Sequence, residues 1–410
     1  MSLLNVDEAR ARILSHFQPV ATETLPLADC NHRVLAQEIA ATTDLPPFDN
    51  SSMDGFAIRV ADLVDVHTDS PRRLRVVADI PAGIYPTISL AQGEAARIMT
   101  GAQVPAGADA VVPVEDTDFG NREAGSAPPE WVAISKSVHT GTNIRARGTD
   151  IQAGEVVLRH GRTLKPQDLG LLAMLGYAVV QVHRKSRVAL FSSGNELLEA
   201  GAPLEPGKIR DSNSYTLAAL LKEAGADVLR LGVARDDRDS VKALLEKAVD
   251  LEVDLILSSA GVSVGAYDFV KEVIEADGKL DFWRVNMRPG KPLAFGKYKS
   301  IPFIGLPGNP VSAFVGFEVF VRDVIGKLNG IDNGLRPKVQ VRCAEQIDSD
   351  GRESYLRAEV REEHGRFVAY LTGHQGSGNL HSLVQANALL IIPAGVKCVP
   401  AGQEVNAWLI

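Results

Sequence analysis

The chain has 410 residues, of which 45% are hydrophobic and 23% charged, and its formal net charge is −8 at neutral pH. These values are typical of a soluble globular protein with roughly two to four domains, and the negative charge argues against a nucleic-acid partner. An anionic small ligand stays open, because the field at such a site is set locally. No apolar stretch approaches the roughly 20 residues that span a bilayer, and the start of the chain lacks the pattern of a secretory signal. We therefore expect a cytoplasmic protein without a membrane partner.

The cysteines point to the same compartment. Cys30, Cys343 and Cys398 form no C-x-x-C pair, and their spacing predicts neither a disulfide nor a zinc site. We expect all of them to be small buried residues in a reducing environment.

The N-terminal part changes from a helical to a β-rich pattern and back. Apolar residues recur at helical spacing over 6–17, and the segment 42–47 then breaks any regular element. From 48 to 140 short apolar runs alternate with glycines and prolines, which predicts a β-rich module. A further helix is predicted over 167–175.

Strand and helix patterns alternate from 186 to 328, which predicts a doubly wound α/β domain. One long helix is predicted over 311–328, and short strands return over 337–410. The predicted strands of the α/β domain are 188–191, 228–233, 255–257 and 303–306.

Loops at the ends of these strands carry the strongest functional signal. They are 192–196, 258–265 and 306–310, and each follows a short apolar run. Small residues and backbone amides at the carboxyl ends of parallel strands, where helices begin, form an anion site. Because no Walker A pattern occurs anywhere in the sequence, the loops predict phosphate or oxyanion binding outside the common ATPase plan.

Acidic residues near loop ends form a candidate metal site. Carboxylate oxygens beside a phosphate loop suit Mg²⁺, which takes one or two protein ligands and the rest of its shell from phosphate and water. The alternative is that these residues only form turns and cap helices, as Asp268 would do three residues after Gly265. The set consists of Asp54, Glu196, Asp236 with Asp237, and Asp268.

Basic residues beside prolines and glycines form a candidate oxyanion site. Arg288 and Lys291 flank a Pro-Gly pair that would hold them stiffly, and Arg145 and Arg147 form a second pair. The alternative is surface charge on tight turns. The histidines show no metal-ligand spacing, and nucleophilic catalysis has no support because neither a G-x-S-x-G elbow nor a Cys–His signature is present.

In combination, these segments resemble the molybdopterin molybdenumtransferases, the family that includes bacterial MoeA and the E domain of animal gephyrin. The matching segments span nearly the whole chain in the order found in that family. They are 47–57, 97–102, 148–151, 191–197, 263–265 with Asp268, 289–292 and 305–312.

The resemblance implies a multidomain subunit of α/β and β parts that works as a homodimer. Its parts would be a discontinuous connecting domain, an inserted β-rich domain, a doubly wound pterin-binding α/β domain and a C-terminal β-barrel. The family places each active site between the α/β domain of one subunit and the inserted domain of the other. The expected bounds, in the same order, are 1–44 with 141–180, 45–140, 181–329 and 330–410.

The resemblance also implies an enzyme that completes molybdenum cofactor biosynthesis. The reaction would be the Mg²⁺-dependent insertion of molybdate into adenylylated molybdopterin, with hydrolysis of the adenylate and release of AMP. Expected partners are the adenylyltransferase that makes the substrate and the molybdoenzymes that receive the cofactor.

Site residues follow from the resemblance position by position. The expected metal ligands are Asp54, Glu196, Asp236 and Asp268. The expected catalytic residues are these four with Thr100 and Asp150. The expected substrate-binding residues are Ser193, Gly194, Ser258, Gly261, Ser263, Arg288, Lys291, Pro307, Gly308 and Pro310.

The sequence departs from the family pattern at a few positions. Asn195 stands where Asp is frequent and removes one candidate metal ligand, and Ala260 places a Cβ where Gly is usual. Arg284 and Arg288 stand where Lys is common, which keeps the charge but changes its geometry.

Other functions remain open at this stage. An adenylyltransferase of the preceding step would share the α/β loops but would not need the segments around Asp54 and Thr100. A scaffold that binds receptor peptides, as gephyrin's E domain does, would use an extra domain and linker that this chain lacks. A paralogue specific for tungstate also remains, because tungstate and molybdate are nearly isosteric.

Overall fold

The structure is a computed structural model that describes residues 3–120, 126–260, 269–331 and 334–410. The chain forms two compact units, each assembled from separate segments. The first unit comprises Met1–Gln37, His160–Gly170 and Ala178–Ile410, and the second comprises Glu38–Arg159 and Leu171–Tyr177. The four expected domain bounds remain predictions beside this two-part division.

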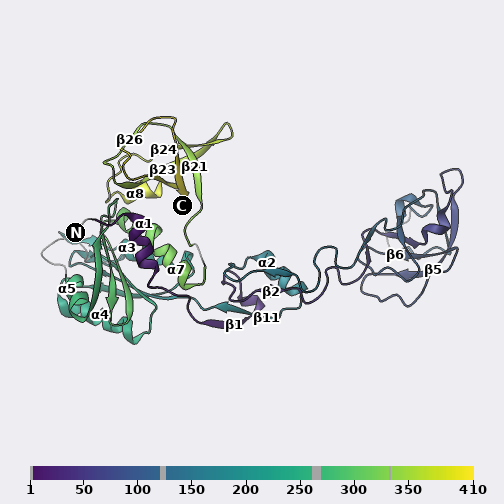
Figure 1. The fold of residues 1–410 in the computed structure, drawn as a ribbon, viewed down its shortest axis with the longest axis horizontal. Coiled ribbons are helices and arrows are strands. Elements are labelled where there is room, and N and C mark those ends of the chain that lie inside the picture. Colours follow the sequence, from purple (N-terminus) through teal and green to yellow (C-terminus); the bar gives the residue numbers. More distant parts are fainter. Residues whose placement is uncertain (1–2, 121–125, 261–268, 332–333) are drawn as a thin grey trace. The chain divides into compact units, whose positions relative to one another are not determined.

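Six strands build the central sheet of the first unit, in the spatial order β15-β12-β16-β20-β19-β17 (Figure 1). The first four pair in parallel, and β19 pairs antiparallel with both β20 and β17. The strands are β15 (Asp227–Ala234), β12 (Arg187–Ser193), β16 (Leu255–Ser259), β20 (Ile301–Leu306), β19 (Pro292–Tyr298) and β17 (Gly278–Arg284). The parallel strands confirm the predicted ones.

The sequence patterns do not predict β17 and β19. Most of β19 is buried, so its side chains show no alternation between apolar and polar. β17 carries Lys279, Asp281 and Arg284 among its apolar residues, which hides a strand pattern.

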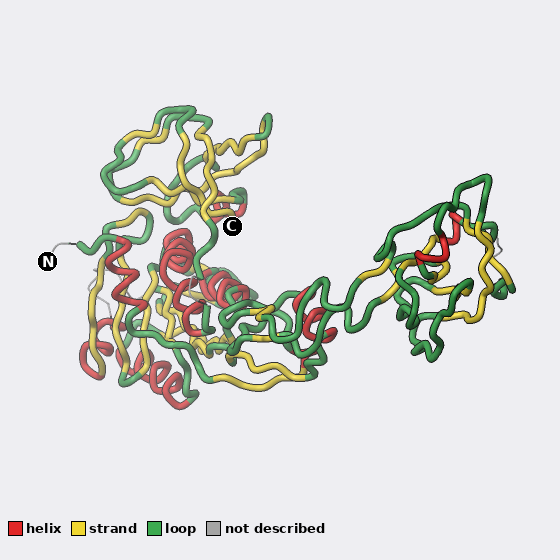
Figure 2. The backbone as a smooth tube through the Cα atoms, turned by 45° about the vertical axis from the view of Figure 1, so that its right-hand side comes forward, coloured by secondary structure: helices red, strands yellow, loops and turns green. Residues whose placement is uncertain are grey.

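Helices cover both faces of the sheet, which confirms the doubly wound α/β fold (Figure 2). Val188 and Leu190 of β12 belong to one apolar cluster, and Ala189 and Phe191 belong to the other, because side chains alternate along a strand. The first cluster includes residues of α1 (Val6–Leu14), α3 (Asn213–Glu223), α6 (Pro310–Gly316) and α7 (Arg322–Leu328). The second includes residues of α4 (Arg238–Asp250) and α5 (Phe269–Asp277).

The single helix predicted over 311–328 is wrong in one respect, since a π-helical segment, Phe317–Val321, separates α6 from α7. Every residue of that segment is buried. Apolar periodicity therefore carries no information there, and it cannot distinguish an α-helical turn from a wider one.

Five strands at the C-terminal end close into a barrel, because the sheet order β23-β24-β21-β27-β25 is completed by a β23–β25 pairing. This confirms the predicted C-terminal β-barrel. A short strand, β18 (Met287–Arg288), pairs with β23 from outside the barrel, and β22 (Ile347–Asp348) pairs with β26 (Cys398–Val399). The barrel strands are β21 (Lys338–Cys343), β23 (Glu353–Glu363), β24 (Arg366–Leu371), β25 (Ala388–Ile392) and β27 (Glu404–Leu409).

The second unit contains a five-stranded sheet in the order β7-β4-β6-β5-β8, which confirms the predicted β-rich module. Gly55 is required where β4 meets β7, because a Cβ there would lie 2.0 Å from the carbonyl oxygen of Val112. The strands are β7 (Ala110–Pro113), β4 (Gly55–Ile58), β6 (Glu94–Ile98), β5 (Arg72–Ile80) and β8 (Trp131–Ile134).

Shorter elements complete the described chain. β1 (Thr22–Pro26) pairs with β11 (Val179–His183), and the helix predicted over 167–175 is α2 (Pro166–Met174). Further short pairs are β2 (Ile39–Ala40) with β10 (Val156–Leu158), β3 (Asn50–Ser51) with β9 (Ile144–Arg145), and β13 (Leu197–Leu198) with β14 (Ile209–Arg210), and the short helix α8 spans Leu380–Val384.

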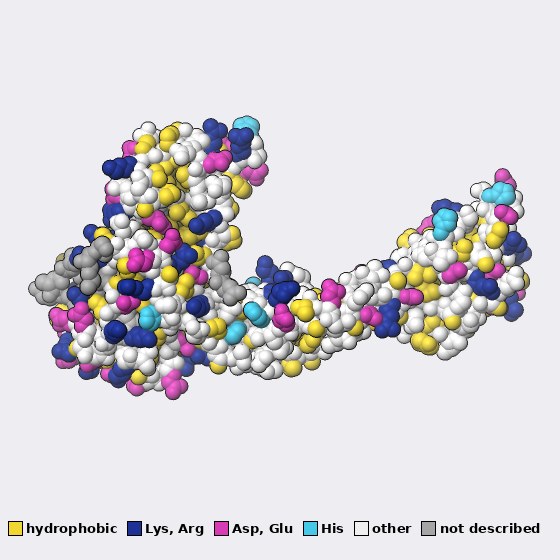
Figure 3. All heavy atoms as spheres, in the orientation of Figure 1, with side chains coloured by type: hydrophobic (Ala, Val, Ile, Leu, Met, Phe, Trp, Pro, Cys, Tyr) yellow, Lys and Arg dark blue, Asp and Glu magenta, His cyan; other side chains and the backbone are white. Residues whose placement is uncertain are grey.

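Two of the three cysteines are buried as predicted, and the third is exposed. Cys30 and Cys343 are buried as expected, but Cys398 is exposed because it points outward on β26 while Val399 points inward. Acidic and basic side chains are interspersed over the face drawn in Figure 3. None of the helices described here has the length and hydropathy needed to cross a membrane.

A buried ion-pair network anchors the helical segment that follows β20. The carboxylate of Glu318, fully buried, accepts hydrogen bonds from Arg322 Nε at 2.7 Å and from Arg336 Nε at 3.0 Å. Arg336 lies in the connection to the barrel, so the network ties the barrel to the helices of the α/β fold. A buried charge of this kind is tolerated because its partners surround it.

We expect Glu318→Ala to lower the free energy of unfolding by about 3–5 kcal/mol, because the substitution removes the buried partner of the Arg322 guanidinium and leaves it only the half-exposed carboxylate of Glu223. Denaturant unfolding measures this loss. Glu359→Ala is the matched control, since Glu359 forms an exposed pair with Arg361 and should leave the unfolding midpoint unchanged. Equal midpoints for the two variants would contradict the anchoring role.

Candidate functional site

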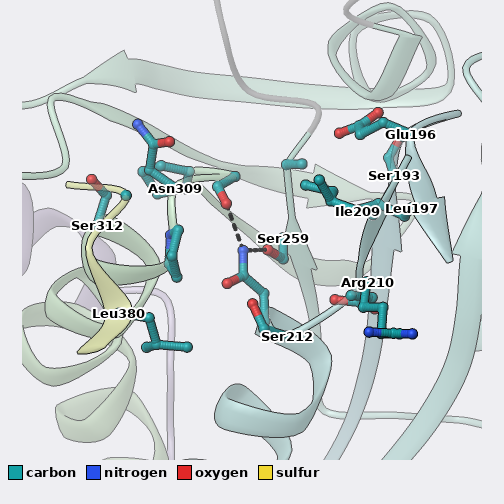
Figure 4. Close-up of a pocket in the computed structure, with 18 of the residues that line it drawn as sticks. Ser193, Glu196, Leu197, Ile209, Arg210, Ser212, Ser259, Asn309, Ser312 and Leu380 are labelled. Carbon is teal, nitrogen blue, oxygen red and sulfur yellow. Dashed lines mark hydrogen bonds between the residues drawn. The ribbon is translucent and has the colours of Figure 1, made fainter. Parts of the chain in front are cut away.

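A cavity of about 800 Å³ lies at the carboxyl ends of the parallel strands of the first unit. Its walls come from the segments that follow β12, β16 and β20, from the start of α3, and from Gly378 and Leu380 of the C-terminal barrel (Figure 4). A ligand site at this edge is what an open parallel sheet favours, because the loops of neighbouring strands converge there.

Asn195 and Asp236 join the loops after β12 and β15. The backbone amide of Asn195 donates to Asp236 Oδ2 at 3.0 Å, and the amide of Asp236 donates to Asn195 Oδ1 at 3.2 Å. Ser193 Oγ is 3.4 Å from Asp236 Oδ1. Asn195 therefore supports the loop, and Asp would accept the same bond, so the departure at this position does not disturb the local fold.

Glu196 presents an exposed carboxylate to the cavity. The side chain folds back over Gly194, where a Cβ would lie 2.5 Å from Glu196 Oε2. Gly194 also has a φ of +153°, so the close approach and the backbone both favour glycine. Within the described residues this carboxylate has no hydrogen-bond partner, which leaves it available to a ligand or a metal ion.

The loop after β20 meets the barrel at the start of α6. Asn309 Nδ2 donates to Ser377 Oγ at 3.0 Å, and the amide of Val311 donates to the carbonyl oxygen of Ser377 at 3.1 Å. The barrel segment 373–379 therefore forms part of the cavity wall and does not lie apart from it.

Arg357 of β23 holds this barrel segment from beneath. Its side chain is fully buried and donates to the carbonyl oxygens of His374, Gln375 and Gly376 at 3.1–3.2 Å. Its Nε also donates to Ser382 Oγ at 3.1 Å. Burial lowers the pKa of this guanidinium. The carbonyl oxygens accept its hydrogen bonds in place of a carboxylate. The sequence offers one signal for this role, an arginine between apolar residues of a strand, where Leu356 and Ala358 on either side face the barrel core.

The charged side chains among the described residues of the cavity wall are mostly acidic. Of these described side chains, one is basic, Arg210, and three are acidic, Glu196, Asp211 and Asp236. Asp211 caps α3 by accepting from the amide of Ser214 at 3.0 Å. The acidic excess opposes binding of a phosphate ligand unless a cation accompanies it.

Several expected site residues meet in this cavity, although their roles remain predictions. Ser258 does not line it, because its side chain points to the opposite face of β16 from that of Ser259. Gly261, Ser263 and Asp268 lie outside the described residues. The expected residues that line the cavity are Ser193, Gly194, Glu196, Asp236, Pro307, Gly308 and Pro310.

Arg288 and Lys291 are not among the residues that line the cavity. Arg288 lies 3.6 Å from Asp350 of the barrel. The hydrogen bond from Arg352, with a smaller contribution from the charge of Arg288, lowers the pKa of Asp350 to about 2. Lys291 is exposed and contributes its backbone carbonyl to the amide of Val285.

The remaining expected residues lie in the second unit. Asp54 Oδ1 accepts from both the amide and the hydroxyl of Thr100, at 2.8 and 2.7 Å. Asp150 pairs with Arg145. Arg147 bonds to Asp44, so both members of the Arg145–Arg147 pair have acidic partners.

The sequence patterns miss several cavity residues. Arg210, Asp211, Asn213 and Ser259 all line it. The one available signal is the Asp-Ser-Asn sequence before α3, which indicates a helix start but not a site. Within the described residues no three His, Cys, Asp or Glu side chains gather closely enough to hold a metal ion by themselves.

Three family descriptions match successive parts of this chain. Residues 4–176 match the MoeA N-terminal region, residues 189–327 match a probable molybdopterin binding domain, and residues 340–410 match the MoeA C-terminal region.

Named relatives are similar along almost the whole chain. A molybdopterin molybdenumtransferase 2 of Mycobacterium tuberculosis is 40% identical over 393 residues, which is 94% of this chain and 94% of the relative. The molybdopterin molybdenumtransferase of Bacillus subtilis is 37% identical over 415 residues, covering 99% and 94%. The crystal structure of a molybdopterin biosynthesis moeA protein from Pyrococcus horikoshii superimposes with a TM-score of 0.84 at 32% identity, with both chains fully covered.

We expect Arg357→Ala to lower the free energy of unfolding by about 3 kcal/mol or more, because it leaves buried carbonyls of the segment 373–379 without donors. The same segment should become a site of cleavage in limited proteolysis. Arg361→Ala, at an exposed position of the same strand, is the matched control and should change neither property. If Arg357→Ala resists protease as well as the control does, Arg357 does not hold the segment.

Proposed function

Because the chain belongs to the molybdopterin molybdenumtransferase family, the family of MoeA, we propose the full reaction that it catalyses. It is an enzyme of molybdenum cofactor biosynthesis that inserts molybdenum into molybdopterin. The proposed form of this step is the Mg²⁺-dependent insertion of molybdate into adenylylated molybdopterin, with hydrolysis of the adenylate and release of AMP. The observation that carries the proposal is the cavity at the carboxyl edge of the α/β sheet.

The cavity suits a large anion that arrives with a divalent cation. Its size is that of a small-molecule site, and hydroxyls, backbone amides and Arg210 supply donors for phosphate oxygens. The acidic excess on the same wall would repel such a ligand alone. Together these features favour a phosphoanhydride bound with a metal ion over a bare oxyanion.

The donor set fits Mg²⁺. The cavity offers the carboxylate of Glu196, which no described residue engages, and that of Asp236 on the neighbouring loop after β15. One or two carboxylates and the oxygens of a substrate phosphate are the ligands that Mg²⁺ prefers. When bound, the ion would neutralise the charge of the phosphoanhydride. Asp54 and Asp268 are further proposed ligands on the strength of the family resemblance.

The proposed reaction changes no oxidation state. One water molecule splits the phosphoanhydride, so that its oxygen ends on a phosphate and AMP leaves. The two dithiolene sulfurs bond to molybdenum and displace one oxygen of molybdate, which leaves as water with the two thiol protons. In this step Arg210 would hold a phosphate and the loops around Ser193 and Gly308 would fix the substrate.

Other parts of the proposal rest on the resemblance. Lys291 and Arg288 are proposed to bind molybdate, although they do not line the cavity. A homodimer, a cytoplasmic location, and the adenylyltransferase and molybdoenzymes as partners also remain proposals. The matches outside the α/β part weigh against an adenylyltransferase, which would need only the α/β loops.

Purified protein given adenylylated molybdopterin, Mg²⁺ and molybdate is expected to release AMP and to form the molybdenum cofactor. Glu196→Gln should raise the Mg²⁺ concentration for half-maximal AMP release about tenfold or more, because it removes a charged ligand. Chromatographic assay of AMP measures both. Glu199→Gln is the matched control, because Glu199 is exposed nearby and does not line the cavity.

The absence of AMP release by the wild-type protein would sink the proposed reaction. An unchanged Mg²⁺ requirement in Glu196→Gln would sink only the ligand assignment. Tungstate in place of molybdate, in the same assay, tests the tungstate-specific alternative.

In the second unit, Asp54→Asn is expected to lower kcat by about a hundredfold while leaving stability unchanged. Asn keeps an Oδ1 atom that can accept both hydrogen bonds of Thr100, so the substitution removes the charge and preserves these two bonds. Asp109→Asn is the control, since Asp109 Oδ1 accepts the amide of Val60 in the same unit. A near wild-type kcat in Asp54→Asn would remove Asp54 from the reaction.

A further inference from the structure

Asn213, the first residue of α3, joins the last residue of β16 to the loop that follows the neighbouring strand β20. It is 8% exposed, and its Nδ2 donates to Ser259 Oγ at 2.7 Å and to the carbonyl oxygen of Gly308 at 2.8 Å (Figure 4). We propose that Asn213 is a positioning residue, which sets the spacing between the end of β16 and the loop after β20 and thereby the shape of the substrate cavity.

The hydrogen-bond chemistry fixes the orientation of this amide. A carbonyl oxygen only accepts, so the Asn213 atom that faces Gly308 has to be the nitrogen. Nδ2 carries two protons, and one bond to each partner uses both of them. The side chain therefore acts as a double donor that no carboxylate of the same shape can replace.

The two hydrogen bonds of Asn213, here called the tie, lie at the end of the described backbone pairing between β16 and β20. β16 and β20 pair in register up to Ser259 and Leu306, and the amide of Ala260 adds one more bond to Leu306 O at 3.0 Å. Among the described residues, the bond from Asn213 to the carbonyl oxygen of Gly308 adds a side-chain link just past this backbone pairing.

Ala260 opposes the tie. A Cβ built on Gly308 would lie 3.2 Å from the Cβ of Ala260, so the methyl group packs against the loop that Asn213 draws in. Ala260 has a φ of +68°, a left-handed conformation that residues with a Cβ adopt only under strain. The hydrogen bonds of Asn213 draw the loop after β20 toward the end of β16, and the methyl group of Ala260 limits how close it comes. Together they fix the distance between these two segments.

This gap shapes the wall that the substrate meets. Ser259, Ala260, Pro307 and Gly308 all line the cavity. The consequence for substrate binding rests on the proposed function, whereas the tie itself is a property of the fold and is testable without any substrate.

The test compares Asn213→Ala and Asn213→Asp with Asn329→Ala. Asp has the size of Asn but presents acceptors to the carbonyl of Gly308, so it should break the tie as completely as Ala does. Asn329 is the matched control: it is 5% exposed, its Nδ2 donates to Gly225 O at 3.2 Å, and its Oδ1 accepts the amide of Ser186, just before β12 at the other end of the sheet.

Hydrogen exchange at the Ala260 amide is the readout that needs no substrate. It should quicken in both Asn213 variants, beyond any change in Asn329→Ala that follows from lower global stability. Unchanged exchange in Asn213→Ala would overturn the proposal. Wild-type exchange in Asn213→Asp would also overturn it, because the residue would then act by filling space.

Kinetics with adenylylated molybdopterin is the second readout. KM should rise about tenfold or more in both Asn213 variants, with a smaller change in kcat, and should stay at the wild-type value in Asn329→Ala. Faster exchange with an unchanged KM would overturn the link between loop spacing and substrate binding. Faster exchange in a protein whose wild type releases no AMP would uphold the tie and refute the proposed reaction.

Discussion

The parallel pairing of β15, β12, β16 and β20 is the constraint on which the rest of the first unit depends. Parallel strands end at a common edge, so segments far apart in the sequence are brought together there without any contact between their strand interiors. Asparagine side chains then form hydrogen bonds between neighbouring segments at the carboxyl ends of the paired strands. Asn195 links the loops after β12 and β15, and Asn213 links the end of β16 to the loop after β20.

Buried charge is handled in two different ways around this edge. Glu318 is surrounded by guanidinium groups and keeps a full ionic partner set. Arg357 has no carboxylate in its shell among the described residues and is satisfied by carbonyl oxygens instead. The first arrangement joins helices to the connection that follows them, and the second fixes a loop. In both cases the interior charge orients a segment that reaches the cavity or its support, which an apolar side chain could not do with the same directionality.

The elements with a clear apolar period could be predicted from the sequence, and those without one could not. The parallel strands, the β-rich module and the short C-terminal strands follow from runs of apolar residues between turns, whereas only the family resemblance predicts the closure of those last strands into a barrel. β19 is buried over most of its length, and the π-helical segment Phe317–Val321 is buried throughout, so neither leaves a periodic trace. The glycine-rich loops indicated where the cavity lies, because such loops have a local signature. Asn213 and Arg357 have none, since their importance comes from partners that lie 46–95 and 17–25 residues away.

The strand β18 has a consequence for how the parts of this chain can be exchanged in evolution. Met287 and Arg288 precede the last parallel strand of the α/β fold, yet they pair with β23 of the barrel. The outermost strand beside the barrel is therefore encoded inside another module. A recombination event that moved residues 330–410 to a new host would leave that edge of β23 bare, and an exposed strand edge invites pairing with other chains. The pairing therefore favours transfer of the barrel together with residues 287–288, so the boundary between the two modules in the sequence does not coincide with a boundary in the sheet.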